Sequence, residues 1–237
     1  MEYSLPPFIF VEIYVRHMEN KFINEILSIY SEIDVQVEAF QFAVKLHCPP
    51  GCGICCKSTK VEANVIELLP LARELFHRGE AEIWMERAQA TCYEGICIFY
   101  DPNPPRMGIG HCRFYAWRPS VCRLFGFSKV KDKTGKPKLA VCIVQKNIMP
   151  DVVENAEKSI FHGIPAPGLT DFFLQIMGVD PSGRLMPINR AIYMALERYG
   201  LEIQMTDSQN QYNIIKTNSA YCAGLEGSSR STFLKKH

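Results

Sequence analysis

Apolar side chains recur every three or four residues between about Met18 and Leu46. That period places them along one face of an α-helix. A shorter alternation over residues 32–37 also fits a strand, but the helical period runs through it. We therefore predict one long amphipathic helix whose apolar face carries Phe22, Ile26, Ile29, Ile33, Val37, Phe40 and Val44.

The rest of the chain alternates between shorter helical segments and turns. The same period predicts helices over residues 63–69, 80–91, 151–161, 169–177 and 188–199, with Pro70 opening a further helical turn. Residues 1–15 are aromatic and β-branched, which favours an extended arm or a short strand. Short strands are expected at residues 95–100 and 139–144, the second after a charged hairpin tip at 129–138. The predicted fold class is mainly α with a small irregular or β cysteine-rich metal-binding lobe, an α+β arrangement.

These elements divide the chain into four regions. An N-terminal arm and long helix occupy residues 1–47, and a cysteine-cluster core occupies residues 48–145. The helices of residues 146–205 are expected to pack on that core, and the polar tail of residues 206–237 is expected to be partly mobile. With 237 residues, 47% of them hydrophobic, the chain can bury a sizeable core without needing a metal merely to fold.

Four cysteines fall within the nine residues 48–56, with glycine and proline between them. The Cys52-x-x-Cys55 step has the spacing that lets two sulfurs converge on one metal ion, and Gly53 gives that turn its backbone freedom. One or two free cysteines are ordinary small core residues, but four so close together favour a metal site. Because consecutive side chains diverge in regular backbone, Cys55 and Cys56 can bind one centre only in an irregular turn. Otherwise one of the two serves another partner or a second metal.

Further cysteines follow in the second half of the predicted core. The candidate ligands are Cys48, Cys52, Cys55, Cys56, Cys97, Cys112, Cys122 and Cys142. All-cysteine ligation suits both zinc and iron–sulfur centres, and eight thiols exceed what one zinc ion needs. We therefore favour an iron–sulfur cluster, such as a four-iron cluster, over zinc. Cys92 and Cys222 are expected to be bystanders, and His47 and His111 are expected to be structural rather than ligands.

Three separated blocks of this sequence resemble the YkgJ-type CxxCxxCC cysteine-cluster proteins, a family described as chelating zinc or iron. The blocks are Cys52-Gly53-Ile54-Cys55-Cys56, Cys97-Ile98-Phe99, and residues 112–125 with Cys112, Tyr115, Arg118, Pro119, Cys122, Arg123 and Phe125. The resemblance covers roughly residues 45–145. It departs from the family pattern at Cys48, which precedes Cys52 by a gap of three residues instead of two. Around its cysteines the family also resembles the flagellin lysine methylases, but this chain has no cosubstrate motif that carries over.

Three arginines lie beside the later cysteines: Arg113 and Arg123 directly follow Cys112 and Cys122, and Arg118 lies four residues before Cys122. Arg113, Arg118 and Arg123 are candidates to hydrogen-bond the sulfurs, because a centre held by four thiolates carries excess negative charge. The alternative is that they lie on the solvated surface or pair with carboxylates such as Asp101.

Two rival functions come from other classes. Cys48-x-x-x-Cys52-x-x-Cys55 has the spacing of a radical-SAM cluster, but helical periodicity surrounds it where β/α units are expected. Residues 113–138 hold eight Lys or Arg against Asp132 alone, with aromatics between them, which would also suit a zinc-stabilised nucleic-acid-binding module. Charge balance for the thiolates is the simpler explanation of this strip, so nucleic acid is the less favoured partner. No motif assigns a substrate or an enzymatic reaction.

Overall composition constrains the partners. A net charge of +1 and a pI near 7.5 argue against a wholesale polyanion binder. No apolar run approaches the roughly 18 residues of a membrane span, and the first residues lack a basic signal-peptide region. A reducing cytoplasm is the expected location, and a metal ion or iron–sulfur cluster is the expected partner. Removing the metal is expected to expose residues 48–58 and 95–145 while residues 20–44 and 186–200 stay protected.

Overall fold

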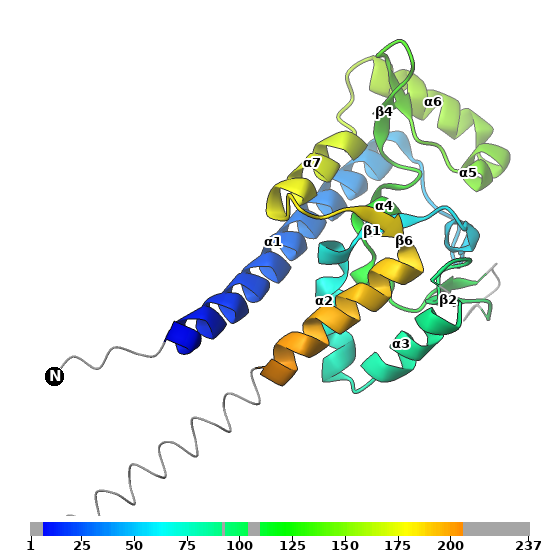
Figure 1. Ribbon diagram of the computed structural model, residues 1–237. Helices are drawn as coiled ribbons and strands as arrows, with labels where there is room; N and C mark the ends of the chain where they lie inside the picture. The colour runs from blue at the N-terminus through cyan, green and yellow to red at the C-terminus, as the bar shows by residue number, and fades with distance from the viewer. Residues whose placement is uncertain (1–6, 92, 104–109, 206–237) are drawn as a thin grey trace, which may run out of the picture.

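The computed structural model describes residues 7–91, 93–103 and 110–205, with side chains from residue 21 onward. Its architecture is mainly α-helical with three small two-stranded antiparallel sheets, which confirms the predicted fold class. Figure 1 shows one long helix with shorter helices grouped along its C-terminal half. The predicted tail at 206–237 lies outside the described residues, as do Cys92 and Cys222.

The long helix α1 spans Pro7–Val44. The prediction of an extended arm over residues 1–15 is wrong for residues 7–15, which are helical. Pro7 occupies the first helical position, where a proline costs no hydrogen bond. Extending a helix from an established turn costs little conformational free energy. This extension therefore overrides the weak strand preference of the aromatic and β-branched residues that follow.

Helix α2 spans Val65–His77 and packs against α1. Asn64 and Glu67 form a reciprocal capping box at its start, and Pro70 lies within the helix. Residues 63 and 64, predicted to be helical, instead belong to strand β1, Glu62–Asn64. This strand pairs with β6, Leu185–Pro187, so a long-range ladder replaces the first helical turn. Helix α3 follows over Ala81–Ala90.

The second half of the chain forms short elements around the cysteines and helices beyond them. Strand β2 (Tyr100–Asp101) pairs with β3 (His111–Cys112), and β4 (Lys129–Lys131) pairs with β5 (Pro137–Leu139). The helical segments are η1 (Ile54–Lys57), η2 (Tyr115–Trp117), α4 (Ser120–Leu124), α5 (Ile143–Ile148), α6 (Pro150–Phe161), α7 (Leu169–Val179) and a helix over residues 188–205.

Two predicted strands are shorter in the structure than expected. Strand β5 ends at Leu139, and Cys142 sits at the start of α5, where its N–H donates to Gln145 Oε1 at 3.3 Å. Within residues 95–100 only Tyr100 lies in a strand. The residues before it form turns, because buried Asn189 accepts from the Ile98 N–H at 3.0 Å and donates to the Glu94 and Ile96 carbonyls.

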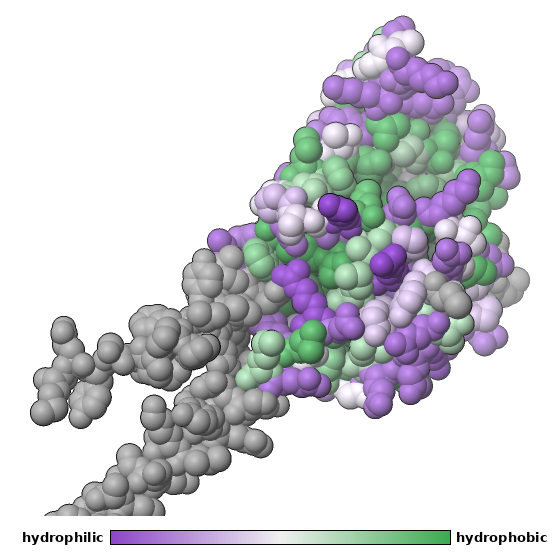
Figure 2. Space-filling model, in the orientation of Figure 1, coloured by the Kyte–Doolittle hydropathy of each residue, from purple (hydrophilic) through white to green (hydrophobic). Residues whose placement is uncertain are grey.

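The buried apolar residues form two cores. The first core lies between α1, α2, α3, α7 and the helix over 188–205, and includes the aromatic cluster Trp84, Phe99 and Phe114. The second core joins the end of α1 to the β4–β5 hairpin and α6 through Phe40, Leu46, Phe127, Leu139, Val153, Ala156, Ile160 and Ala166. Figure 2 shows hydrophilic residues covering the end of the molecule that this hairpin and α6 form. The cysteine-rich segments lie between the two cores.

None of the helices in the described residues has the length and apolar character that crossing a membrane requires.

Candidate metal centre

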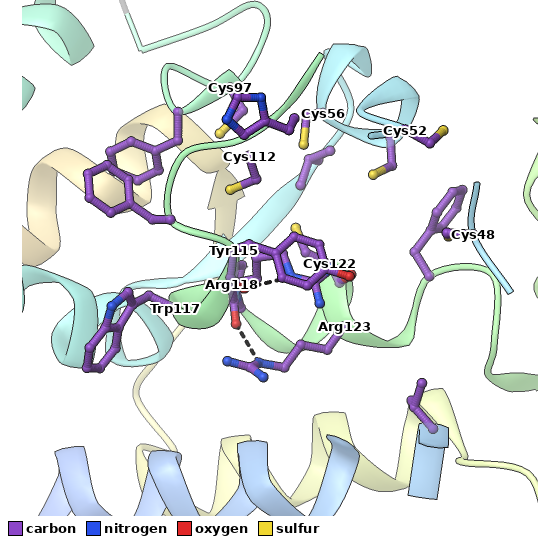
Figure 3. Close-up of a pocket in the computed structure, with 18 of the residues that line it drawn as sticks. Cys48, Cys52, Cys56, Cys97, Cys112, Tyr115, Trp117, Arg118, Cys122 and Arg123 are labelled. Carbon is purple, nitrogen blue, oxygen red and sulfur yellow. Dashed lines mark hydrogen bonds between the residues drawn. The ribbon is translucent and has the colours of Figure 1, made fainter. Parts of the chain in front are cut away.

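A cavity of about 690 Å³ lies between the cysteine segments and α1, and all eight candidate cysteines line it. These eight cysteines are free thiols, and seven of them are at least partly exposed. Figure 3 shows several of them directed toward the cavity together with Tyr115, Arg118 and Arg123. Cysteines up to 94 positions apart, from Cys48 to Cys142, therefore meet at one cavity.

The first cysteine segment turns tightly between α1 and α2. The Cys52 N–H donates to the Pro49 carbonyl at 3.2 Å, and Gly51 has a positive φ of 70°. The short 3₁₀ turn η1 carries Cys55 and Cys56, with the Cys56 N–H donating to the Gly53 carbonyl at 3.0 Å. This is the irregular backbone that adjacent ligands require.

Glycines bring the first cysteine segment against the later one. A Cβ on Gly53 would stand 2.7 Å from the Gly110 carbonyl oxygen, so only glycine permits this approach. Gly110 has a φ of 89° and itself packs against the Asp101 carbonyl and the Tyr100 ring. The β2–β3 hairpin, which ends at Cys112, is thereby held beside the segment that carries Cys55 and Cys56.

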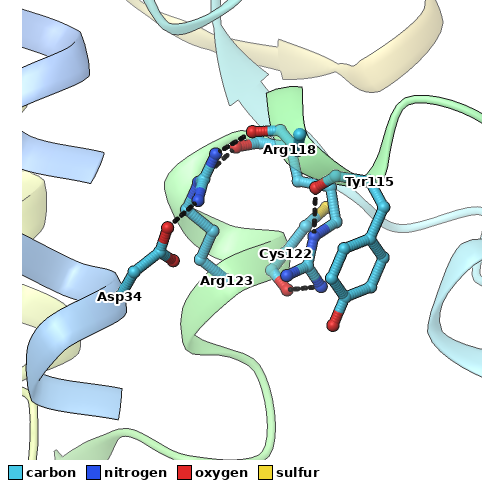
Figure 4. A network of polar contacts seen from close by, with 6 residues as sticks. Asp34, Tyr115, Arg118, Cys122 and Arg123 are labelled. Carbon is cyan, nitrogen blue, oxygen red and sulfur yellow. Dashed lines mark hydrogen bonds and ion pairs between the residues drawn. The ribbon is translucent and has the colours of Figure 1, made fainter. Parts of the chain in front are cut away.

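Cys122 lies on the short helix α4, which contacts with Glu67 of α2 and with Asp34 and Tyr30 of α1 hold in place. The Glu67 carboxylate accepts from the Ser120 N–H at 2.8 Å and so caps α4. Buried Arg123 pairs with Asp34 of α1 at 2.5 Å and donates to the Arg118 and Ala116 carbonyls (Figure 4). Its guanidinium also stacks on the Tyr30 ring of α1. Helix α4 is too short to hold its own position, so this network places Cys122.

The thiols differ in how readily they ionise. Cys56 lies in hydrogen-bond contact with Cys112 and Cys55, and these contacts raise the pKa of Cys56 strongly. The same contacts lower the pKa of Cys112 and lower that of Cys55 to about 6. Burial raises the pKa of Cys97 to about 12, raises that of Cys122, and raises that of Cys48 to about 11. A metal ion binding here would have to displace protons from most of these thiols.

In the described part of the chain, no three side chains of His, Cys, Asp or Glu already stand close enough to hold an ion. To complete a metal centre, the thiols would have to come closer together than they stand in this structure. The donor chemistry nevertheless fits, because soft thiolates are the ligands that zinc and iron–sulfur centres use.

The three arginines occupy different positions. Arg113 is about half exposed and pairs with Asp101 at 2.8 Å. Arg123 directs its donors to Asp34 and to main-chain carbonyls. Arg118 lines the cavity, stacks on the Tyr115 ring and donates to the carbonyls of Tyr115 and Cys122. The positive charge of Arg118 helps to lower the pKa of Cys55 and that of Cys112.

The two histidines beside cysteines also differ. The Nδ1 atom of His47 lies 3.2 Å from the Lys45 carbonyl on the exposed surface. The Nδ1 atom of His111 is buried without a hydrogen-bond partner in the described structure, and His111 lines the cavity.

The residues that position the site were not apparent from the sequence. The Asn64-x-x-Glu67 spacing is a capping-box signal that could have been recognised before the structure. Asn189 and Asp34 carried no such signal, because each acts on a segment about 90 residues away.

Residues 47–143 match a family model named CxxCxxCC and described as "Putative zinc- or iron-chelating domain". This match confirms the resemblance for that part of the chain, and its range contains all eight cavity cysteines. It supports metal binding as the general function of this region. No curated protein and no solved structure matches the chain.

Proposed function

We propose that the protein binds a metal through its cavity cysteines and holds an iron–sulfur cluster, with zinc as the alternative. The observation that supports this most is the convergence of eight free cysteines from separated segments on one cavity. A structural role alone would not require so many reactive groups at one place, because a small apolar side chain would pack equally well.

The surroundings suit an anionic centre. Four thiolates around a divalent ion leave a net negative charge, and a cluster bound by four thiolates is also anionic. Arg118 supplies a fixed positive charge at the cavity wall. The eight cavity thiols are more than one four-coordinate zinc ion needs, and soft thiolate ligands suit an iron–sulfur cluster, which we favour. The centre would serve electron transfer or metal handling in a reducing compartment such as the cytoplasm, which keeps thiols reduced.

A radical enzyme is less well supported by the architecture. Such an enzyme would place the Cys48-x-x-x-Cys52-x-x-Cys55 motif after a strand at the start of repeated β/α units. Here the motif follows α1 and leads into η1, and the described strands form only small antiparallel sheets.

The lysines of the basic strip lie on the β4–β5 hairpin. Lys129, Lys131 and Lys138 are exposed, and Asp132 caps the turn by accepting from Thr134 and Lys136. This arrangement is an ordinary solvated hairpin and does not by itself favour nucleic acid.

The test is purification without oxygen, followed by absorbance spectroscopy and by iron, sulfide and zinc analysis. A brown protein with iron and acid-labile sulfide would support the cluster, and colourless protein with stoichiometric zinc would support the alternative. Protein that contains neither metal, and takes up neither after reduction and reconstitution, would overturn the proposal.

A further inference from the structure

His111 carries a buried nitrogen atom that has no hydrogen-bond partner among the described residues. This atom is Nδ1 of its imidazole ring. The Nδ1 atoms of two other histidines, His47 and His162, lie 3.2 Å and 2.7 Å from main-chain carbonyl oxygens. Buried polar atoms of folded proteins are nearly always hydrogen-bonded, so the missing partner of His111 requires an explanation.

The position of His111 narrows the choice of that partner. His111 lies on strand β3, lines the cavity that the eight cysteines line, and directly precedes Cys112. Its main chain lies against the first cysteine segment, because a Cβ on Gly53 would stand 3.0 Å from the His111 nitrogen. Gly53 in turn precedes the 3₁₀ turn that carries Cys55 and Cys56. Cysteines of two separate segments therefore flank His111.

The acidic residue opposite His111 does not supply the partner. Asp101 faces His111 in the β2–β3 ladder, but both of its carboxylate oxygens have other partners. Its Oδ2 atom pairs with Arg113 at 2.8 Å, and its Oδ1 atom accepts from the Asn103 N–H at 2.9 Å. The remaining acceptors of suitable chemistry are the cysteine sulfurs of the cavity.

A metal-bound thiolate is the kind of acceptor that such a nitrogen suits. A thiol loses its proton when it binds a metal, and its sulfur then becomes a good acceptor with negative charge. Groups that donate hydrogen bonds to the sulfurs of an anionic centre stabilise it. Figure 3 shows Cys56 and Cys97 on the side of the cavity that Cys112, the neighbour of His111, occupies.

We propose that Nδ1 of His111 donates a hydrogen bond to a thiolate sulfur of the bound metal centre and thereby strengthens metal binding. His111 is then a positioning residue that acts through the sulfur, and the ligands themselves remain cysteines. This inference rests on the proposed metal-binding function, and it gives a role to a histidine that the sequence predicted to be structural.

The experiment measures zinc affinity of the reduced full chain by competition with a coloured chelator. His111→Leu removes the donor and is expected to weaken zinc binding by about tenfold, as loss of a group that supports a metal ligand typically does. His111→Asn keeps an N–H donor close to the position of Nδ1 and should recover most of the affinity. His47→Leu is the matched control, because exposed His47 also precedes a cavity cysteine, and it should change the affinity by less than about twofold.

Cobalt(II) provides a readout that a purely structural role would not change. A hydrogen bond to a thiolate lowers the energy of the sulfur electrons. Its loss in His111→Leu should therefore move the thiolate-to-cobalt charge-transfer band to longer wavelength, and His111→Asn should move the band back toward its wild-type position.

The stability of the metal-free protein separates this role from packing. An apolar side chain in place of an unpartnered buried polar group is neutral or stabilising, so metal-free His111→Leu should unfold at no lower urea concentration than wild type. A lower midpoint, or a variant that does not fold, would show that His111 already has a structural partner and would overturn the inference.

Two further results would also overturn it. One is wild-type zinc affinity and an unshifted cobalt band in His111→Leu, and the other is failure of His111→Asn to restore either quantity. Metal binding as the proposed function would survive both results. Wild-type protein that binds neither zinc nor cobalt would instead refute the proposed function itself.

Discussion

Arg118 shows how one side chain can tune several thiols at once. Its guanidinium stacks on the Tyr115 ring, with its central carbon 3.3 Å from the ring centroid, and donates to the carbonyls of Tyr115 and Cys122. These contacts fix a positive charge beside the cavity, and no carboxylate of the described residues forms a salt bridge with it. Arg113, by contrast, is paired with Asp101 and half exposed.

Replacing Arg118 with glutamine is therefore expected to weaken zinc binding by roughly tenfold, the lower end of the effect typical for groups that support metal ligands. Competition with a coloured zinc chelator at fixed pH measures the affinity. Arg113→Gln is the matched control and should change the affinity by less than about twofold, because an exposed, paired charge is strongly screened. Equal effects of the two substitutions would contradict the role given to Arg118.

At the scale of elements, the site depends on short segments held by longer ones. Gly53 allows the first cysteine segment to approach Gly110, and Glu67 of α2 caps α4. Neither contact belongs to the regular hydrogen-bond pattern of a helix or a sheet. Both join parts of the chain about 55 residues apart or more.

Gly53→Ala should separate the two cysteine segments. Its Cβ would stand 2.7 Å from a main-chain oxygen, which cannot move aside as a flexible side chain would. We expect a loss of about 1–3 kcal/mol in the free energy of unfolding, together with reduced metal content. Gly178→Ala in α7 is the control, because its Cβ would meet nothing within 4 Å, and it should be neutral or slightly stabilising. Urea unfolding and elemental analysis check both variants, and unchanged metal content in Gly53→Ala would contradict the expected separation.

The Glu67 cap should also appear in the pH dependence of stability. Burial raises the pKa of the Glu67 carboxyl above its ordinary value of 4.5, and hydrogen bonds from Ser120 and Asn64 only partly offset this. A raised pKa in the folded state stabilises the protein below the unfolded pKa, and this contribution is lost as pH rises through the folded pKa. The unfolding free energy of wild type minus that of Glu67→Gln should therefore fall as pH rises above about 4.5. Urea titrations of both proteins across this range measure the difference, and a difference that rises with pH would show that the shift has the opposite sign.

At the scale of the whole molecule, the features that could be predicted are those whose signal lies in residues close together in the sequence. The 3.6-residue period of Ile26, Ile29 and Ile33 predicted α1 from about Met18 onward, and the cysteines singled out in the sequence as candidate metal ligands all line one cavity. The β1–β6 ladder could not be predicted, because three-residue strands separated by more than 100 positions leave no periodic signal. The same holds for Asn189, whose contacts with Glu94 and Ile98, on either side of Cys97, depend entirely on tertiary packing.

The two cores imply that metal removal should loosen the molecule unevenly. The buried residues of the first core, such as Ile26 and Ile192, hold α1 and the helix over 188–205 together and include no cysteine, although Cys97 and Cys112 pack against them. After anaerobic removal of the metal with chelator and reductant, hydrogen exchange should become fast in residues 48–58 and 95–145. Residues 20–44 and 186–200 should stay protected. Uniform loss of protection would show that the centre holds the whole fold together.

The claim that the cavity cysteines bind metal is tested most directly by X-ray absorption at the metal edge of protein purified without oxygen. We predict a first coordination sphere made of sulfur alone, with about four metal–sulfur bonds of about 2.3 Å if the metal is zinc. The signal should disappear from a variant in which five cavity cysteines are replaced by serine, namely Cys52, Cys97, Cys112, Cys122 and Cys142. A first sphere of nitrogen and oxygen, or an unchanged spectrum in that variant, would contradict the account.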